Sequence, residues 1–236
     1  MIQDYWESED KSVQLYCADC LEVMKNIIDV DAVITDPPYG VNWQSNWRND
    51  KYELMKNDNA IFTNWISGIK ANFFYCFSVW KTMQLYIDEI SANNYEIKDV
   101  LVWDKKSHGM GDLNSYAPCY ELIIFAKKDK SKLNFKHNRR QNVLRYWRVD
   151  GGATGISTNN ILCHPAQKPV ELIKALIMDC TELNNIVFDP FMGSGTTGVA
   201  CVQTGRKFIG IEINKEYYNI SKERISNAQL QIRMKI

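Results

Sequence analysis

The stretch VFDPFMGSGTTGVACVQTGRKFIGIEIN, residues 187–214, decides the fold. It starts as an apolar strand, turns through Gly193, Gly195 and Gly198 in the spacing GxGxxG, continues as a helix and ends in a second strand that closes on Glu212. Glycines in such a turn let the backbone approach a ligand closely, and an acid about 20 residues later can accept ribose hydroxyls. The stretch therefore predicts a nucleotide-binding loop in an α/β fold.

Two kinds of cofactor fit this loop, a dinucleotide such as NAD and the sulphonium nucleoside S-adenosylmethionine. A dinucleotide site usually opens its chain, with the second half of the fold after it, whereas this loop begins near residue 187 of 236. Asp189, inside the loop, also suits the positive methionyl ammonium of S-adenosylmethionine. We therefore favour the methyl donor and keep NAD as the alternative.

The rest of the chain alternates short apolar runs with longer amphipathic stretches, which predicts strands joined by helices. The expected strands are residues 13–17, 31–35, 72–79, 100–103, 120–126, 186–188 and 207–211. The expected helices are residues 21–28, 52–69, 81–91, 170–179, 194–203 and 216–229. The sequence thus predicts a mainly parallel, seven-stranded, Rossmann-like sheet with helices on both faces.

The composition is that of an ordinary globular protein. The chain has 45% apolar residues, 24% charged residues and six prolines. This composition excludes the disordered, collagen-like and coiled-coil classes of protein. Lys plus Arg equals Asp plus Glu at 28 each, so a uniformly basic coat is excluded too. The longest apolar runs fall short of the roughly 20 residues of a membrane span, and residues 1–11 do not resemble a secretory signal. We expect a soluble, cytoplasmic protein with no membrane partner.

Seven cysteines are scattered along the chain, at positions 17, 20, 76, 119, 163, 180 and 201. Their odd number and apolar surroundings predict reduced and mostly buried thiols. Cys17 and Cys20 form a CxxC pair, but zinc needs further ligands, and the three histidines lie far along the chain. We expect no metal site.

The second informative motif is DAVITDPPYG, residues 31–40. An apolar strand runs into Asp36, and two prolines then keep the backbone extended without a backbone N–H at either position. The Pro37 carbonyl is thereby left to point outward, and the aromatic Tyr39 follows Pro38. A strand that ends in a Pro-Pro turn would explain DPP alone, but DPPY beside the glycine loop is a more specific combination.

With these two motifs the chain resembles the amino-group DNA methyltransferases, which carry a D/N/S-PP-Y/F/W motif and a cofactor loop of the FxGxG kind. DPPY at 36–39 precedes FMGSG at 191–195, the β arrangement of that family. HPAQKPVELIKALI, residues 164–177, is similar to the segment that the family places before its glycine loop. LYCADCLEVM, residues 15–24, resembles its adenine-capping strand and turn.

The resemblance implies a role for each matching residue. Asp36, Pro37, Pro38 and Tyr39 would hold the target base. The cofactor, S-adenosylmethionine, would be bound by residues from four segments, Asp19, Lys168, Asp189, Phe191, Gly193, Gly195, Thr196 and Glu212. Of these, Asp19 would take the adenine amino group, Glu212 the ribose hydroxyls, and Lys168 would lie near the methionyl carboxylate.

These residue types suit methyl transfer to an exocyclic amino group. Its lone pair is delocalised into the ring, and acceptance of its hydrogens by Asp36 and the Pro37 carbonyl would free that lone pair. Direct in-line transfer needs no covalent enzyme intermediate, and no cysteine nucleophile follows the prolines. The base must leave the duplex stack to be reached, and an aromatic residue such as Tyr39 can stack on it.

One basic segment, residues 127–148, holds nine Lys and Arg residues against the single acid Asp129. Such a segment is either solvated surface or a face for DNA phosphates. Because the family keeps its target-recognition region between its two motifs, we expect residues 127–160 to be a short recognition insertion in a catalytic domain of residues 1–126 and 161–236. The expected DNA contacts are Lys132, Lys136, Arg139, Arg140, Arg145 and Arg148.

The sequence thus predicts an S-adenosylmethionine-dependent DNA methyltransferase of the kind found in restriction-modification systems, acting on adenine N6. An aspartate at the head of the tetrad usually accompanies adenine in this family. Cytosine N4 is the first alternative, then RNA or a protein glutamine, and a non-catalytic DNA-binding relative is the rival from another class. The resemblance leaves room for a homodimer and for a partner restriction nuclease.

Overall fold

The computed structural model describes residues 1–27, 29–39, 63–107, 114–135, 139–149 and 167–234. Its strands are β1 (Asp4–Glu7), β2 (Val13–Cys17), β3 (Val30–Thr35), β4 (Ala71–Ser78), β5 (Glu96–Asp104), β6 (Tyr120–Lys127), β7 (Val143–Arg145), β8 (Ile186–Asp189) and β9 (Lys207–Glu212). Its helices are α1 (Cys20–Met24), α2 (Met83–Ala92), α3 (Val170–Cys180), α4 (Thr196–Thr204) and α5 (Lys215–Arg233), with a 3-10 helix η1 (Asn64–Ile66).

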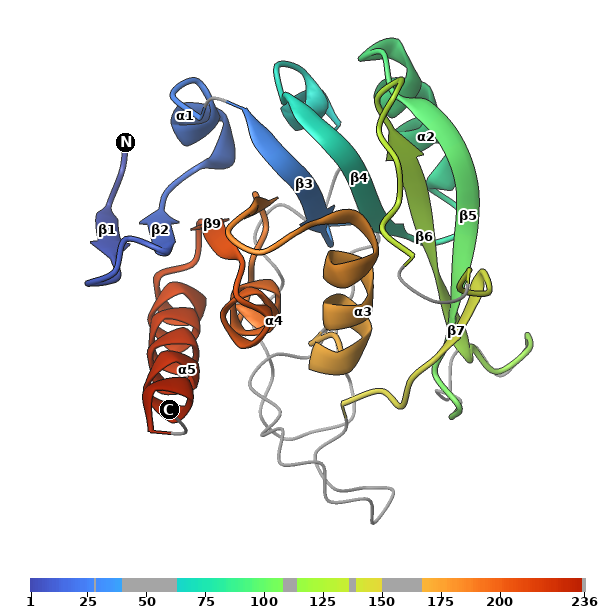
Figure 1. Ribbon diagram of the computed structural model, residues 1–236. Helices are drawn as coiled ribbons and strands as arrows, with labels where there is room; N and C mark the ends of the chain where they lie inside the picture. The colour runs from blue at the N-terminus through green and yellow to red at the C-terminus, as the bar shows by residue number, and fades with distance from the viewer. Residues whose placement is uncertain (28, 40–62, 108–113, 136–138, 150–166, 235–236) are drawn as a thin grey trace.

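These strands form one sheet in the order β1-β2-β9-β8-β3-β4-β6-β5-β7 (Figure 1). The run from β2 to β4 is parallel throughout, and β7 is parallel to β5. β6 is antiparallel to both of its neighbours, and β1 is antiparallel to β2. The expected α/β fold with a mainly parallel sheet is confirmed.

The expected number of seven strands is wrong, because the described part of the chain holds nine. All seven expected strands form, and the two additional ones, β1 and β7, lie at the two edges of the sheet. β1 has the sequence DYWE and is mostly half-exposed, and β7 has only three residues. Edge strands as short as these carry little apolar alternation, so their sequences give no clear strand signal.

Five of the six expected helices form, with shifted ends. The last one is longer than expected and is capped by Asn214, whose side chain accepts the backbone N–H groups of Glu216 and Tyr217 at 2.8 and 3.3 Å. The first is shorter and ends at Met24. Most of the helix expected at residues 52–69 lies outside the described residues, and the described end of that stretch contains η1.

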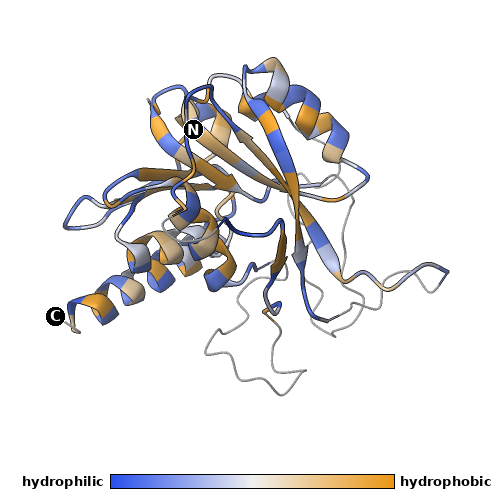
Figure 2. Cartoon of the chain, turned by 45° about the vertical axis from the view of Figure 1, so that its right-hand side comes forward, coloured by the Kyte–Doolittle hydropathy of each residue, from blue (hydrophilic) through white to orange (hydrophobic). Residues whose placement is uncertain are grey.

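Helices cover both faces of the sheet (Figure 1). One face carries α3, α4 and α5 over Leu15, Ile34 and Tyr75, and the other carries α1, α2 and η1 over Val33 and Phe74. Neighbouring strand residues such as 33 and 34 point to opposite faces, so both must be apolar, and the central strands are largely orange in Figure 2. None of the described helices is both long and apolar enough to span a membrane.

All strands except β1 and β6 point the same way, so their carboxyl ends meet at one edge of the sheet. We call this the carboxyl edge; it contains the ends of β3 at Thr35, β8 at Asp189 and β9 at Glu212. The opposite, amino edge contains the starts of β4 and β5. Ligands of open α/β sheets bind beyond the carboxyl ends of the strands, so the chemistry is expected at the carboxyl edge.

Candidate active site

The DPPY motif leaves the sheet at the carboxyl edge, directly after β3. Pro37 is buried, and Asp36, Pro38 and Tyr39 are partly buried. The Tyr39 hydroxyl donates to Asp36 Oδ1, and the hydroxyl of Tyr86, on α2, donates to the Pro38 carbonyl at 2.9 Å. The first hydrogen bond closes the motif on itself, and the second ties it to α2.

Asp189 begins the glycine loop and is nearly inaccessible to solvent. Its carboxylate accepts hydrogen bonds from Thr35 Oγ1 at 2.8 Å, Thr197 Oγ1 at 2.7 Å and the Phe191 backbone N–H at 3.1 Å. Burial raises the pKa of Asp189 to about 6, although these hydrogen bonds oppose the rise. The carboxylate thus fastens the loop to β3 and α4.

The DPPY motif and the glycine loop lie side by side. β3 and β8 are neighbouring parallel strands, with Ala32 opposite Val187. The bond from Thr35 to Asp189 joins residues 154 positions apart. Both loops therefore share one edge of the sheet.

Two acids stand at the neighbouring strand ends. Glu212 closes β9, and its carboxylate accepts the backbone N–H groups of Gly193 at 3.0 Å and Asn214 at 2.7 Å. Burial raises the pKa of Glu212 to about 7 despite these bonds. Asp19 follows β2, is exposed and caps α1. The two residues to which the resemblance assigns the ribose hydroxyls and the adenine amino group thus stand at the ends of the neighbouring strands β9 and β2.

The loop glycines differ in what their backbones face. Gly193 has a φ of +51°, and a Cβ built on it would meet nothing within 4 Å. Gly195 has a φ of +80°, but its Cβ would lie 2.7 Å from the Cβ of Ser221 on α5. The open side of Gly193, beside Glu212, fits a closely approaching ligand, whereas Gly195 is required by helix packing.

The two remaining loop residues are inside the fold. Thr196 is buried as the first residue of α4. The ring of Phe191 packs edge-on against Trp65, with 5.1 Å between the ring centroids. Both shape the loop from within.

Lys168 contacts two carboxylates in the structure. Its ammonium is on the DPPY motif, where it donates to Asp36 Oδ2 and stands 3.2 Å from Glu121 Oε2. The side chain is only 7% exposed. A buried ammonium needs anionic partners, and these two carboxylates are at hand.

The charges around Lys168 act on one another. Burial raises the pKa of Asp36, which Glu121 raises further and Lys168 lowers. Burial also acts to raise the pKa of Glu121, but Lys168 and Lys105 outweigh it and hold that pKa below its usual value. Burial and the nearby charge of Asp36 raise the pKa of Tyr39 far above its usual value. Lys168 is therefore the main charge that opposes the rise in the pKa of Asp36.

The sequence does not identify Lys105 or Tyr86 as members of this site, and it indicates Glu121 only as a residue at a family-like position in the core or in support of the site. Glu121 and Lys105 form an ion pair of 2.7 Å beside Lys168, and Tyr86 supports Pro38. Glu121 had one available signal, because it is a charged residue in the otherwise apolar strand YELIIFAK. Tyr86 gives no such signal, since an aromatic residue on a helix is typical of any core.

The first part of the basic segment lies at the amino edge. Lys128 donates to the carbonyls of Asn93 and Asn94, after α2, at 2.8 and 3.1 Å, and Lys127 donates to the Ser131 carbonyl at 2.9 Å. Lys132 follows and is exposed. The eight residues of β4 separate this edge from the DPPY motif, roughly 25 Å at about 3.3 Å per residue.

The second part reaches toward the carboxyl edge along β7. Arg139 is exposed, and Arg140 forms a two-pronged ion pair with Asp179 of α3, at 2.7 and 3.1 Å. Arg145 is 3.6 Å from Asp104, and Arg148 is partly buried. Lys136 is outside the described residues. Of the expected DNA contacts that the structure describes, Arg145, at the end of β7, and Arg148, just after it, are thus the ones on the side of the carboxyl edge.

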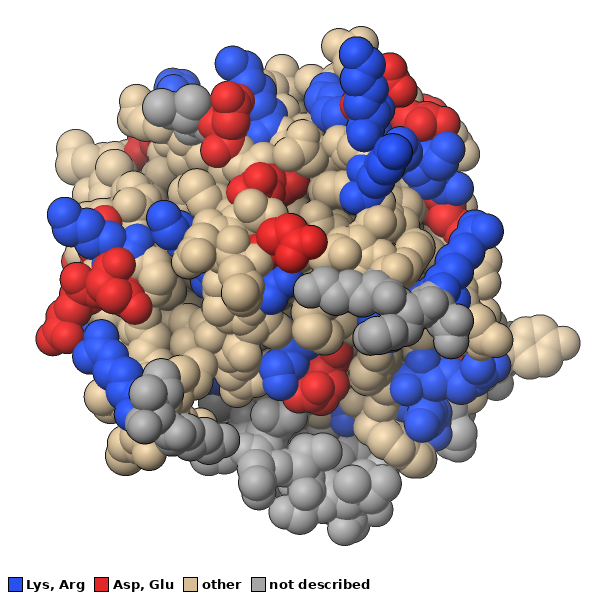
Figure 3. All heavy atoms as spheres, in the orientation of Figure 1, with Lys and Arg blue, Asp and Glu red and all other residues tan. Residues whose placement is uncertain are grey.

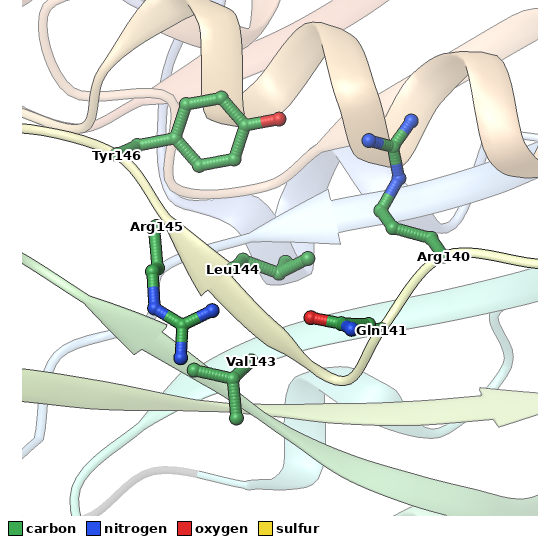
Figure 4. Close-up of a pocket in the computed structure, with 6 residues that line it drawn as sticks. All are labelled: Arg140, Gln141, Val143, Leu144, Arg145 and Tyr146. Atoms are coloured by element: carbon green, nitrogen blue, oxygen red, sulfur yellow. The ribbon is translucent and has the colours of Figure 1, made fainter.

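Figure 4 shows a shallow hollow along β7, lined by Arg140, Gln141, Val143, Leu144, Arg145 and Tyr146. Arg140 and Tyr146 point toward α3, whereas Arg145 points away from it. On the wider surface, Lys and Arg side chains gather on the right-hand side of Figure 3, over the β5–β7 side of the sheet, with acidic side chains among them. Part of this positive charge is therefore neutralised within the protein.

The fold and the two loops define a Rossmann-like methyltransferase. Residues 30–223 match the N6/N4 methyltransferase family model described as DNA methylase, and the chain therefore belongs to this DNA methylase family.

Known relatives match over most of their length. The chain is 28% identical to the Type II methyltransferase M2.MboI of Moraxella bovis, over 94% of this chain and 91% of that protein. It is 29% identical to the DNA adenine methyltransferase YhdJ of Escherichia coli, over 89% and 81%.

Solved structures agree in fold. The crystal structure of the M1.HpyAVI–SAM complex has 30% sequence identity and a TM-score of 0.68, with 90% of this chain and 99% of that chain covered. The PvuII DNA methyltransferase, titled cytosine-N4-specific, has a TM-score of 0.70 at 18% identity, over 98% and 96%. The expected family is confirmed, and with it S-adenosylmethionine as the cofactor of the family.

Proposed function

We propose that this protein transfers a methyl group from S-adenosylmethionine to the N6 amino group of adenine in DNA. The observation that carries the proposal is the pairing of β3 with β8, because it brings Asp36 and the Asp189 loop to one edge of the sheet. When bound, S-adenosylmethionine supplies an electrophilic methyl group on its sulphonium.

The residues at the carboxyl edge suit this cofactor. Glu212 would accept the two ribose hydroxyls, and the open side of Gly193 would let the nucleoside approach the backbone. Asp19 would accept from the adenine amino group. Asp189, with Phe191, Gly195 and Thr196, holds the loop in shape, and the Asp189 carboxylate adds negative charge for the methionyl ammonium. We assign Lys168 to Asp36 rather than to the methionyl carboxylate.

The acceptors of the DPPY motif would activate the target nitrogen. Asp36 and the Pro37 carbonyl accept the two amino hydrogens, which draws the nitrogen toward a tetrahedral geometry and frees its lone pair. Well-oriented reactants gain on the order of 7 to 11 kcal/mol of barrier, so positioning by these two groups supplies much of the rate. No protein nucleophile is needed.

The target base must leave the duplex stack, at a cost of a few kcal/mol. Stacking on Tyr39 would return about 1 to 3 kcal/mol of this. The hydroxyl of Tyr39, held on Asp36, keeps the ring beside the acceptor of the amino hydrogens.

We propose that DNA lies across the carboxyl edge. Arg145, Arg148 and the exposed Trp147, after β7, are on the side of the basic segment that faces this edge. Residues 127–160 would thus contribute to target recognition mainly through their second part. Lys132 and Arg140 are assigned to the surface and to α3 instead.

Adenine is favoured by two observations, the aspartate at the head of DPPY and the likeness to YhdJ, a DNA adenine methyltransferase. Cytosine N4 is the second candidate, supported by the fold shared with the PvuII enzyme.

The test is incubation of the protein and S-adenosylmethionine with unmethylated DNA, followed by mass spectrometry of the nucleosides. N6-methyladenine is expected, and the Asp36→Ala variant is the matched control that should give none. N4-methylcytosine would move the target to the second candidate, and the absence of both products from the wild-type reaction would refute the proposed activity.

A further inference from the structure

Four charged residues form a chain that ends on the catalytic motif, and we call them the charge chain: Lys105, Glu121, Lys168 and Asp36. Lys105 lies 2.7 Å from Glu121 Oε1, and Lys168 lies 3.2 Å from Glu121 Oε2 and in contact with Asp36 Oδ2. Each of the four side chains is between 7% and 22% exposed. Charges so well shielded from water interact strongly, so the chain acts as a unit.

Lys168 stands where the substrate must bind. In the proposed function, Asp36 accepts an amino hydrogen of the target base. In the structure, the ammonium of Lys168 and the hydroxyl of Tyr39 already donate to the two oxygens of Asp36. A carboxylate oxygen can accept more than one hydrogen bond, but Asp36 is only 22% exposed, so a base that approaches it competes with these two donors for the little open space around the carboxylate.

Displacement of a buried ammonium is costly unless a second anion receives it. Glu121 is such an anion. Its Oε2 is buried and accepts no hydrogen bond from any described residue, although Lys168 is 3.2 Å away. Only a small movement of the ammonium would turn this contact into a hydrogen bond.

We propose that Glu121 is a positioning residue that receives the Lys168 ammonium when the amino group of the target base takes its place on Asp36. This inference rests on the proposed function. Lys168 then pairs with Asp36 while no base is bound and withdraws to Glu121 when one arrives. No covalent bond changes, and the ammonium keeps a carboxylate partner throughout.

Lys105 is the outer end of the charge chain and directly follows β5. Trp103 of β5 pairs with Glu121 of β6 in the sheet. Lys105 binds the other oxygen of Glu121 and lies 5.3 Å from the Trp103 ring centroid. Its charge keeps Glu121 anionic even when Lys168 is on Asp36. Glu121 is thus held ready by a partner that does not touch Asp36.

A double-mutant cycle of Glu121→Gln and Lys168→Gln tests this role. In Glu121→Gln the ammonium has lost its receiving carboxylate, so kcat/KM for DNA is expected to fall by about 100-fold, as for loss of one partner of a buried ion pair. In the Lys168→Gln background the same substitution should cost less than about threefold, because no ammonium remains to be received. Equal losses in both backgrounds would overturn the inference, as would an unaffected Glu121→Gln.

Two controls separate this role from stability. Glu171→Gln removes a carboxylate from the exposed pair with Lys174 on α3 and should leave kcat/KM unchanged. If Glu121→Gln does not fold, Glu121→Asp keeps the charge on a side chain one methylene shorter. In a protein that keeps Lys168, Glu121→Asp should retain at least tenfold more activity than Glu121→Ala. Equal activity of these two variants would count against the role.

A second readout needs no turnover. In a carbon-13 NMR titration of the Asp36 carboxyl, Glu121→Gln should lower the pKa of Asp36, because a neighbouring negative charge is removed, and Lys168→Gln should raise it. Tyr39, Cys76 and Asp189, the other titratable groups near Asp36 in the described chain, are unchanged in both variants. A wild-type protein that transfers no methyl group would refute the proposed function and with it the role of Glu121, whereas an unshifted titration would refute the charge chain and leave the proposed function standing.

Discussion

Replacement of Glu212 by glutamine should change how the stability of the protein depends on pH. Glu212 accepts the backbone N–H groups of Gly193, in the glycine loop, and of Asn214, before α5. Burial nevertheless raises its pKa from the usual 4.5 to about 7. The native protein therefore binds the proton of this carboxyl more tightly than the unfolded chain does. Glutamine has nearly the same shape and has no proton to lose in this range.

The sign and size follow from linkage. A raised pKa stabilises the native state below the unfolded-state pKa, and this contribution is lost as pH rises from about 4.5 to about 7. At about 1.4 kcal/mol per pH unit, the loss is at most about 3 kcal/mol. Because Glu212 is only partly buried as a residue, solvent screening reduces this to about 2 kcal/mol.

Urea unfolding of wild type and Glu212→Gln between pH 4.5 and 8 measures the effect. The unfolding free energy of the variant minus that of the wild type should rise by about 2 kcal/mol across this range. Hydrogen bonds lost or gained by the amide add only a constant offset. Glu223→Gln, on an exposed position of α5, is the matched control and should give a flat difference. A flat difference for Glu212→Gln would refute the argument, because it would mean that the hydrogen bonds from the backbone N–H groups cancel the effect of burial on the pKa.

The same carboxylate should make cofactor binding depend on pH. If the ionised form accepts the ribose hydroxyls, the Kd of S-adenosylmethionine should rise about tenfold for each pH unit below about 7. In Glu212→Gln the affinity should be lower by about 100-fold and no longer follow pH in this way. Isothermal titration calorimetry at several pH values provides both numbers, and equal pH dependence of the two proteins would contradict the proposed ribose contact.

Three further outcomes are expected. Gly193→Ala should fold with a loss of about 1–2 kcal/mol of stability at its positive φ and should weaken cofactor binding, because its Cβ enters the open side of the loop. Gly198→Ala should lower stability by about 1–3 kcal/mol, because its Cβ would lie 2.4 Å from Ile225 Cδ1; thermal melting measures the stability changes and calorimetry the cofactor binding. Tyr39→Ala should reduce DNA binding and turnover by about 1 to 3 kcal/mol and keep cofactor affinity, and an equal loss of cofactor affinity would argue against a stacking role. Lys106→Ala, exposed near the Trp147 ring at the carboxyl edge, should lower the salt slope of DNA binding by about 0.9, whereas Lys132→Ala at the amino edge should leave it unchanged.

The sequence predicted the central part of the fold because its signals are local. Glycines at 193 and 195 adopt the positive φ values that their turn requires. DPPY follows a buried strand, and this strand cannot continue through two prolines. Apolar runs buried on both faces identify the parallel strands. Edge strands β1 and β7 lack that burial, so they were missed.

The partners of these motifs were decided only by the tertiary structure. Nothing local to HPAQKP indicates that Lys168 lies on Asp36, since the contact joins residues 132 positions apart through the pairing of strands and the placement of α3. Nor does a run of basic residues reveal which of them reach the carboxyl edge, because β6 carries Lys127 away from it and β7 carries Arg145 back. Backbone geometry and burial are encoded in short stretches of sequence, whereas charge pairing depends on which stretches the sheet brings together.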